Sequence, residues 1–533
     1  MSQGDIEKEG VVESTLGQRI AVLLASIMGS SMAFVNGTAV TLALDPIQAG
    51  LNASLGEMLW VASIYMLFIS ALMLIGGAIG DFYGRRATFI AGVILFTIAS
   101  IGCAAAPTAE VLIFARAIQG MGAALLTPMS LTLLSDYFPR KSRGMAIGIW
   151  SVASAIMTAI GPPVGGWLVE FASWRMIFIL PLPFGILSML IAWWFVPKRP
   201  PARIPDRIDW AGALLAIIGF AGIAYGFITL SEPHSAHKSL EWGVPIGIGL
   251  VALLLLVIVE REVKSPMMPP ELFGISTFNA INVITFLLYG AMGGIFVFYP
   301  IFLTDAFGFR MNEIGVAFLG FALPMVIFTP LSAKLARRYG VRMMLATGSL
   351  VGVAAFASMG LAPWSGTLAG VFGSITIFGA GIALVVPGMN TALFNATPEH
   401  SHGVASGINN AAARAATLFA IAGYGAVAGW AFYKVAEKNP VVSAVGYGAG
   451  DELVGLNAAN YREAMIYSFE MLAWVSIALC FLAFIVAMFF IDPSIEKSHP
   501  HGHEGEEEAQ STGIRRIFGA SLGDRTDVDE DDD

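Results

Sequence analysis

Long apolar stretches alternate with short polar segments along almost the whole chain. A helix needs roughly 20 mainly apolar residues to cross a bilayer, and fourteen stretches are about that long or longer. They lie near 19–44, 57–79, 88–106, 110–136, 144–169, 175–196, 210–230, 242–260, 276–304, 313–335, 342–361, 366–394, 404–431 and 466–491. The pattern predicts an all-α polytopic membrane protein with fourteen transmembrane helices.

The composition agrees with this prediction. Hydrophobic residues make up 56% of the chain, charged residues only 13%, and mean hydropathy is +0.74, whereas a soluble domain carries about 25% charged residues. The net charge of -9 comes largely from the C-terminal tail, and both cysteines, Cys103 and Cys480, lie in apolar stretches. No disulfide framework, metal site, phosphate loop or soluble catalytic motif is indicated. We expect neither an enzyme, nor a cofactor, nor a nucleic-acid partner.

Two of the apolar stretches repeat one another. The segment QGMGAALLTP at 119–128 is echoed by FGAGIALVVP at 378–387, with an offset of 379 − 120 = 259 residues. The same offset relates Pro139 to Pro398 in the polar segments that follow. Internally repeated membrane domains that meet at a central site are typical of secondary transporters. The repeat therefore predicts two related six-helix bundles.

The basic residues indicate how the helices are oriented. Arginine and lysine gather in one set of alternate loops, which the positive-inside rule places in the cytoplasm together with both termini. We expect a monomeric integral protein of the bacterial inner (plasma) membrane. The predicted divisions are a cytoplasmic N-terminus at 1–18, an N-terminal bundle at 19–196, a linker with two inserted helices at 197–261, a C-terminal bundle at 262–492 and an acidic disordered cytoplasmic tail at 493–533.

Two motifs are candidates for gating and for the conformational change. The loop after the second helix reads GGAIGDFYGRR at 76–86 and combines small residues with an acid and two cations; the carboxylate can change partners or lie at a helix N-terminus. The fifth helix contains GPPVGG at 161–166, in which proline bends the helix and glycine permits close packing. The alternatives are a loop that only fixes topology and a kink without a role in transport. The candidate residues are Gly77, Asp81, Gly84, Arg85, Arg86, Gly161, Pro162, Gly165 and Gly166.

An arginine lies deep in the fourth predicted helix, in the segment RAIQGMG at 116–122. A charged side chain at this depth is costly in hydrocarbon and must face the protein interior. The repeat offset places Ile375 and Phe378 where the first copy has Arg116 and Gln119, whereas the glycines persist in both copies. Packing alone therefore does not require the arginine. A functional site and a structural cation held by backbone carbonyls remain alternatives.

These motifs resemble those of the major facilitator superfamily. The family signatures are G-x-L-a-D-r-x-G-r-r in the loop, R-x-x-q-G-x-G in helix four and g-x-x-x-G-P-x-x-G-G in antiporters, where this chain has Met157 in place of the first glycine. The segments WRMIF at 174–178 and DWAG at 209–212 extend the similarity to the fourteen-helix drug/proton antiporter group. The resemblance implies a major facilitator fold, alternating access to a midplane cavity, and proton-linked efflux of amphipathic compounds.

The first helix departs from that group. The usual pattern is l-D-x-T-i-V-N-V-A-L-P, but this chain reads VNGTAVTLALD at 35–45, so Asn36 replaces the intramembrane acid. An amide cannot take up and release a proton at accessible pH. This departure favours an alternative function, uptake of a small aromatic metabolite or vitamin such as riboflavin. A transporter-derived sensor that signals through the tail is a third hypothesis.

Polar and aromatic residues of several helices are predicted to line the substrate cavity. They are Asn36, Thr38, Tyr65, Arg116, Gln119, Asn282, Tyr289, Asn390 and Arg414. Such a lining suits a neutral or anionic, partly aromatic small-molecule solute, with protons as the expected coupling ion. Each Ser, Thr or Asn can instead join two helices through a hydrogen bond.

Overall fold

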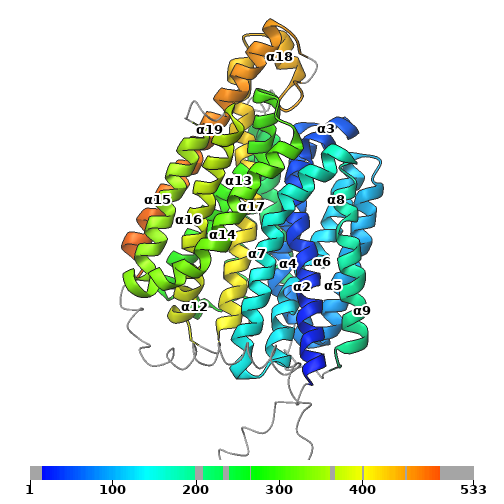
Figure 1. The fold of residues 1–533 in the computed structure, drawn as a ribbon, viewed down its shortest axis with the longest axis vertical. Coiled ribbons are helices and arrows are strands. Elements are labelled where there is room, and N and C mark those ends of the chain that lie inside the picture. The colour runs from blue at the N-terminus through cyan, green and yellow to red at the C-terminus, as the bar shows by residue number, and fades with distance from the viewer. Residues whose placement is uncertain are drawn as a thin grey trace, which may run out of the picture. The chain divides into compact units, whose positions relative to one another are not determined.

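The computed structural model describes residues 15–198, 208–231, 239–263, 266–360, 366–398, 401–450 and 453–492. This part of the chain is almost entirely helical and contains no β-strand (Figure 1). The predicted acidic tail and the basic linker at 199–207 lie outside the described residues.

The helices follow the predicted order. The first half contains α2 (Leu16–Ala39), the short 3-10 helix η1 (Val40–Leu42), α3 (Leu44–Leu51), α4 (Leu55–Tyr83), α5 (Arg85–Ala105), α6 (Ala109–Tyr137), α7 (Arg140–Phe171), α8 (Met176–Ile179) and α9 (Pro181–Phe195). The inserted pair is α10 (Trp210–Leu230) and α11 (Ser239–Glu262). The second half contains α12 (Pro270–Phe273), α13 (Ser276–Phe307), α14 (Met311–Tyr339), α15 (Val341–Gly360), α16 (Leu368–Ala396), α17 (His402–Ala436), α18 (Pro440–Val445) and α19 (Leu456–Phe490). Fourteen spans within the described ranges are long and apolar enough to cross a membrane, which confirms the predicted number.

The glycines that persist in both repeat copies are helix contact points. A side chain carbon at Gly120 of α6 would lie 2.8 Å from the Tyr65 carbonyl oxygen of α4, and one at Gly379 of α16 would lie 2.6 Å from the Phe321 carbonyl oxygen of α14. Both distances are shorter than real side chains tolerate. The repeated sequence is therefore explained by the same close helix crossing in each half.

Tight reversals connect α4 to α5 and α14 to α15. Gly84 has φ +98° and Gly340 has φ +88°, backbone angles that glycine adopts without a steric penalty. Gly84 and Gly340 thus permit the two tight reversals. We call the end of the molecule with these two turns the basic face, since Arg85, Arg86 and Arg338 lie beside them, and the other end the opposite face.

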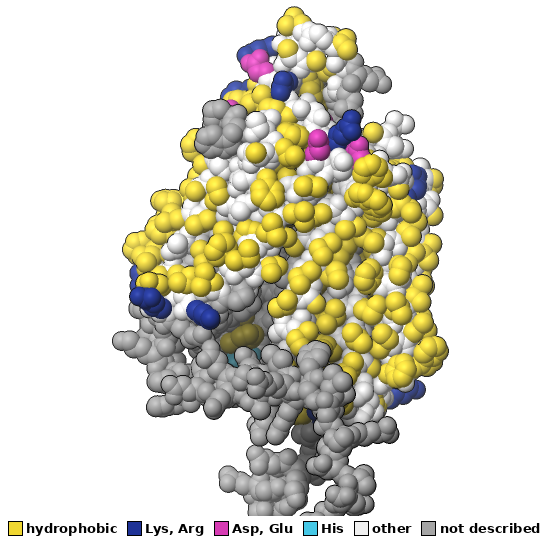
Figure 2. Space-filling view, viewed as in Figure 1, with side chains coloured by type: hydrophobic (Ala, Val, Ile, Leu, Met, Phe, Trp, Pro, Cys, Tyr) yellow, Lys and Arg dark blue, Asp and Glu magenta, His cyan; other side chains and the backbone are white. Residues whose placement is uncertain are grey.

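The two halves pack most closely toward the opposite face. A side chain at Gly166 of α7 would overlap the Met311 carbonyl oxygen of α14, and one at Gly425 of α17 would lie 2.5 Å from Leu59 of α4. Nearer the basic face, neither Gly77 of α4 nor Gly403 of α17 has an atom within 4 Å of its would-be side chain. Figure 2 shows that the described surface is hollowed near the basic face. The halves therefore pack together toward the opposite face, and the contact between α4 and α17 continues as far as Leu74 and Gly407 but ends before Gly77 and Gly403.

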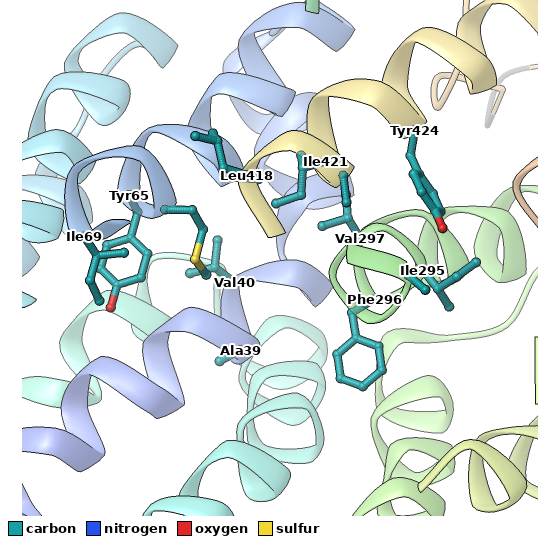
Figure 3. Close-up of a cluster of buried hydrophobic side chains, with 14 of the residues drawn as sticks. Ala39, Val40, Tyr65, Ile69, Ile295, Phe296, Val297, Leu418, Ile421 and Tyr424 are labelled. Carbon is teal, nitrogen blue, oxygen red and sulfur yellow. The ribbon is translucent and has the colours of Figure 1, made fainter. Parts of the chain in front are cut away.

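One continuous hydrophobic core spans both halves. Figure 3 shows part of it, with Tyr65 and Ile69 of α4 on one side and Phe296 of α13 and Ile421 of α17 on the other. This apolar contact between α4 of the first half and α13 and α17 of the second half joins the two halves.

The inserted helices do more than separate the halves along the chain. Phe220 of α10 packs edge-on against Phe419 of α17 with 5.4 Å between ring centroids, and Tyr225 of α10 lies 6.2 Å from Trp60 of α4. The insert thus contacts a helix of each half, α4 and α17, which also contact each other.

Substitution of Gly166 by alanine tests the contact between α7 and α14. The added methyl group has no room beside Met311, and overpacking costs about 1–3 kcal/mol. We expect a lower melting temperature for the purified Gly166→Ala protein. Gly148→Ala in the same helix is the matched control, because nothing lies within 4 Å of that position and alanine favours a helix by about 1 kcal/mol over glycine. Equal melting temperatures for both variants would contradict the proposed contact.

Candidate functional site

Arg116 lies at the centre of a buried polar cluster in the first half. Its side chain is 1% exposed. Its Nε donates to the Val61 carbonyl oxygen at 3.2 Å, and one terminal nitrogen donates to Asn36 Oδ1 at 2.5 Å and to Gln119 Oε1 at 2.6 Å. The guanidinium also stands 4.4 Å from the centre of the Tyr65 ring. Four predicted cavity residues are therefore brought together, from α2, α4 and α6.

A second layer of hydrogen bonds holds this cluster in place. Gln119 Nε2 donates to Ser100 Oγ at 2.8 Å, and the Tyr65 hydroxyl donates to the Ala33 carbonyl oxygen at 3.2 Å. The Nδ2 atom of Asn36 is buried without a hydrogen-bond partner. Arg116 and Gln119 are one helical turn apart on α6, which places both side chains on the same face.

Neutral groups surround the charge of Arg116. The two ion pairs found among the described residues both involve Arg85, and neither includes Arg116. Amide and carbonyl oxygens accept three of its hydrogen bonds without cancelling the charge, and the Tyr65 ring adds a cation-π contact. The interior of the first half therefore keeps a positive charge.

The corresponding region of the second half is aromatic. Phe378, the repeat partner of Gln119, lies 4.8 Å from Phe356, 5.8 Å from Phe321 and 6.2 Å from Phe296, measured between ring centroids. Ile375, the repeat partner of Arg116, is also buried. The two halves share helix packing but differ in the chemistry of their interiors.

Arg414 is a second arginine within a membrane-spanning helix, α17. It is half-buried, and its guanidinium lies 5.5 Å from the centre of the Phe34 ring of α2. Arg116 thus lies over a ring of α4, that of Tyr65, whereas Arg414 lies over a ring of α2.

The remaining predicted cavity residues are placed differently. Asn282 Oδ1 accepts a 3.2 Å hydrogen bond from Asn409, which joins α13 to α17. Thr38 Oγ1 contacts the Thr158 carbonyl oxygen at 3.1 Å and so joins α2 to α7. Asn390 is exposed on α16 and Tyr289 is half-buried on α13. Two of these side chains therefore have interhelical partners, and contact with solute stays a prediction for all of them.

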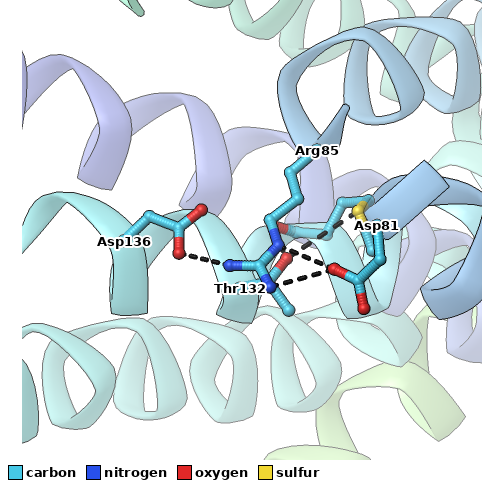
Figure 4. Close-up of polar contacts among 5 residues, drawn as sticks. Asp81, Arg85, Thr132 and Asp136 are labelled. Atoms are coloured by element: carbon cyan, nitrogen blue, oxygen red, sulfur yellow. Dashed lines mark hydrogen bonds and ion pairs between the residues drawn. The ribbon is translucent and has the colours of Figure 1, made fainter. Parts of the chain in front are cut away.

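The charged loop forms an ion-pair cluster within the first half. Arg85 contacts Asp81 Oδ1 at 2.9 Å and also pairs with Asp136 of α6, as Figure 4 shows. Arg86 instead donates to the carbonyl oxygens of Ala192 and Trp193 at the end of α9. Asp136 was not among the residues predicted from the sequence, although its position just before the basic segment at 140–143 was an available signal.

The GPPVGG segment lies where α7 crosses its neighbours. A side chain at Gly161 would overlap Thr38 Oγ1, and one at Gly165 would lie 2.8 Å from the Ala39 carbonyl oxygen. Pro162 contributes its carbonyl oxygen to the contact with Gly315 of α14. The motif therefore packs against α2 on one side and against the second half on the other. Within the described ranges, no group of three or more His, Cys, Asp or Glu side chains is arranged to hold a metal ion.

Comparison with known proteins extends over most of the chain. The family model described as Major Facilitator Superfamily matches residues 23–421. A methylenomycin A resistance protein of Streptomyces coelicolor is 30% identical over 410 residues, which are 76% of this chain and 85% of that protein. Multidrug resistance protein Stp of Mycobacterium tuberculosis is 30% identical over 394 residues, 74% of this chain and 73% of that protein. Multidrug transporter protein MdtP of Bacillus subtilis is 27% identical over 400 residues, 74% of this chain and 72% of that protein.

Solved structures share the fold at lower sequence identity. A bacterial homologue of the human lysosomal transporter Spinster, in an inward-facing and occupied conformation, superposes with a TM-score of 0.64 at 18% identity, covering 88% of this chain and 97% of that one. A D-xylose-proton symporter gives a TM-score of 0.59 at 16% identity, covering 90% and 99%. These structures confirm the predicted fold class.

Removal of the Arg116 side chain should destabilise the protein. Arg116→Ala leaves the oxygens of Asn36, Gln119 and Val61 without their donor, and each unsatisfied buried group costs about 1–3 kcal/mol. We expect a clearly lower melting temperature for the purified variant. Arg175→Ala is the control, because Arg175 also lies over an aromatic ring and bonds one carbonyl, that of Ala106, but is only partly buried. A melting temperature of Arg116→Ala no lower than that of Arg175→Ala would contradict the cluster.

Proposed function

This chain belongs to the major facilitator superfamily, and from that premise we propose that it exports amphipathic organic compounds from the cell in exchange for protons. The observation that carries the proposal is the arrangement of the two halves relative to one another, with a polar cluster in the interior of the first half. They pack through Gly166 and Met311 at the opposite face and leave Gly77 and Gly403 without close neighbours toward the basic face. Three relatives with names that denote resistance or multidrug transport support the same function.

The arrangement fits one state of an alternating-access cycle. We infer that the basic face is cytoplasmic, because arginines gather beside its turns and cytoplasmic loops of bacterial inner membrane proteins are rich in such residues. Both termini are then cytoplasmic, and the structure corresponds to the state that is open to the cytoplasm. Export requires a second state in which α4 and α17 meet at the basic face and α7 and α14 separate at the opposite face.

Proton coupling must use a group other than the side chain at position 36. Asn36 accepts a hydrogen bond from Arg116, and an amide does not titrate at accessible pH. An uncompensated Arg116 also favours the alternative function, uptake of a small aromatic metabolite such as riboflavin, because a positive interior disfavours cations relative to neutral or anionic solutes.

Asp81 is expected to act when the basic face closes. In the present state its partner Arg85 is also held by Asp136, so Asp81→Asn should change the melting temperature little. Partly exposed ion pairs contribute about 0–1 kcal/mol. Closure brings the carboxylate toward the N-terminal end of α17, where the helix dipole favours a negative charge. We therefore expect slower transport by Asp81→Asn at normal stability, with Glu57→Gln as a control at the opposite face. Wild-type transport by Asp81→Asn would refute the gate.

Inside-out vesicles test the direction of transport and the role of position 36 together. If the protein exports its solute, the solute should accumulate inside energised vesicles only while a proton gradient is present. A protonophore should then abolish the accumulation. Asn36→Asp places a carboxylate against Arg116, where a buried ion pair forms and cancels the charge. We expect this variant to export the cation ethidium several-fold better than the wild type, and to handle riboflavin less well.

Asn52→Asp is the control in these vesicles, since it adds a carboxylate at an exposed position that is not among the predicted cavity residues. Strong gradient-driven ethidium export by the unaltered protein would refute the role assigned to Asn36. Movement of riboflavin in the uptake direction, with no gradient-driven export of any amphipathic solute, would replace the proposed function by the alternative.

A further inference from the structure

Arg414 differs from Arg116 in what surrounds its charge. Arg116 is 1% exposed and donates to three oxygens. Arg414 is half-buried, and its guanidinium lies over the Phe34 ring. In the described part of the chain, Arg414 has no hydrogen-bond or ion-pair partner. Its planar fork of N–H donors is suited to a carboxylate, sulfonate or phosphate group. A half-buried cation with unused donors between the two halves is a place where a ligand can bind.

We propose that Arg414 and the aromatic pair Phe34–Trp150 bind an aromatic organic anion, with the negative group on the guanidinium and the ring against the two aromatic side chains. This inference rests on the proposed function, because it names the class of solute that the transporter moves. Phe34 of α2 and Trp150 of α7 meet edge-on with 6.3 Å between their ring centroids. Such a corner offers an aromatic solute both an edge and a face.

The aromatic pair is held in a fixed orientation. Trp150 Nε1 donates to Ser30 Oγ at 3.1 Å, Ser30 donates to Ser130 Oγ at 2.9 Å, and Ser130 donates to the Leu126 carbonyl oxygen at 2.9 Å. This chain of hydrogen bonds ties α7 to α2 and α6. Trp150 is therefore ordered before a solute binds, and binding needs less additional ordering of side chains.

The charges near the site favour an anion over a cation. Arg414 lies at the site itself, over the Phe34 ring, and it takes part in no ion pair among the described residues. An organic cation in this position would face the like charge of Arg414 in a medium that screens poorly. An anion would supply the countercharge that the protein itself does not provide there.

The site also joins the two halves. Phe34 and Trp150 belong to the first half, and Arg414 belongs to the second. A solute that contacts all three side chains bridges the halves, so its binding free energy depends on how far apart they are. A binding site of this kind links occupancy to the change between the two states of the cycle.

The test is a binding measurement with two permanently charged probes that share one ring system. Purified full-length protein in lipid nanodiscs is titrated by equilibrium dialysis with 2-naphthalenesulfonate and with N,N,N-trimethyl-2-naphthylammonium. We expect the wild type to bind the sulfonate at least tenfold more tightly than the ammonium. Arg414→Gln should weaken sulfonate binding at least tenfold, and Arg414→Lys should restore part of the loss by returning the charge without the planar fork.

Arg462→Gln is the matched control. Arg462 also lies over a phenylalanine, with 5.1 Å from its guanidinium to the Phe307 ring, but it is exposed near the opposite face, so this variant should bind the sulfonate as the wild type does. Phe34→Leu provides a second variant that keeps Arg414 and should weaken binding of the sulfonate several-fold. Melting temperatures of all variants identify any that fail to fold.

Four results would overturn the inference: no sulfonate binding by the wild type, equal or tighter binding of the ammonium, unchanged binding by folded Arg414→Gln, or an equal loss in Arg462→Gln. None of them bears on whether a proton gradient drives export in vesicles. Failure of the anion site and failure of the proposed function are therefore distinguishable.

Discussion

A charge inside a membrane protein must be held by groups that the protein supplies, and the interior of this one is organised around that requirement. Arg116 meets it with the oxygens of Asn36, Gln119 and Val61 and with the ring of Tyr65. These groups accept three hydrogen bonds from the guanidinium but leave its charge in place. A carboxylate at position 36 would cancel the charge and would also titrate. Whether position 36 carries an amide or a carboxylate thus decides whether the interior of the first half is positive or neutral.

The fold could be predicted from the sequence to a large extent because the bilayer restricts it. A spanning segment must satisfy its own backbone hydrogen bonds, so long apolar stretches are helices, and the number of spans follows from counting them. The glycines repeated at an offset of 259 residues predicted two related halves, and the structure places them at close helix crossings. Their neighbours, Tyr65 for Gly120 and Phe321 for Gly379, come from equivalent helices of the two halves.

The site was less predictable, for a physical reason. Spacing along one helix places Arg116 and Gln119 on one face, but it does not show which side chain of another helix meets them. The contacts of Arg116 with Asn36 and of Arg414 with Phe34 join residues far apart in the chain. Asp136 was missed for the same reason, since its pairing with Arg85 connects α6 to α5. Phe34, Ser30 and Trp150 carry no charge and match no motif, so nothing in the sequence distinguished them from ordinary helix residues.

The two arginines differ in what happens to them when the halves move. The partners of Arg116 lie on α2, α4 and α6, so the whole cluster belongs to the first half and can move with it as one body. The cluster of Arg85 with Asp81 and Asp136 is also contained in that half.

By contrast, the contact of Arg414 with Phe34 crosses from the second half to the first, and any rocking of one half against the other must change it. Arg116 therefore provides a constant positive charge through the cycle, whereas the surroundings of Arg414 depend on the state of the transporter. Only the second kind of contact can convert binding of a solute into a preference for one state, because a ligand shifts an equilibrium only through a difference in its interaction with the two states.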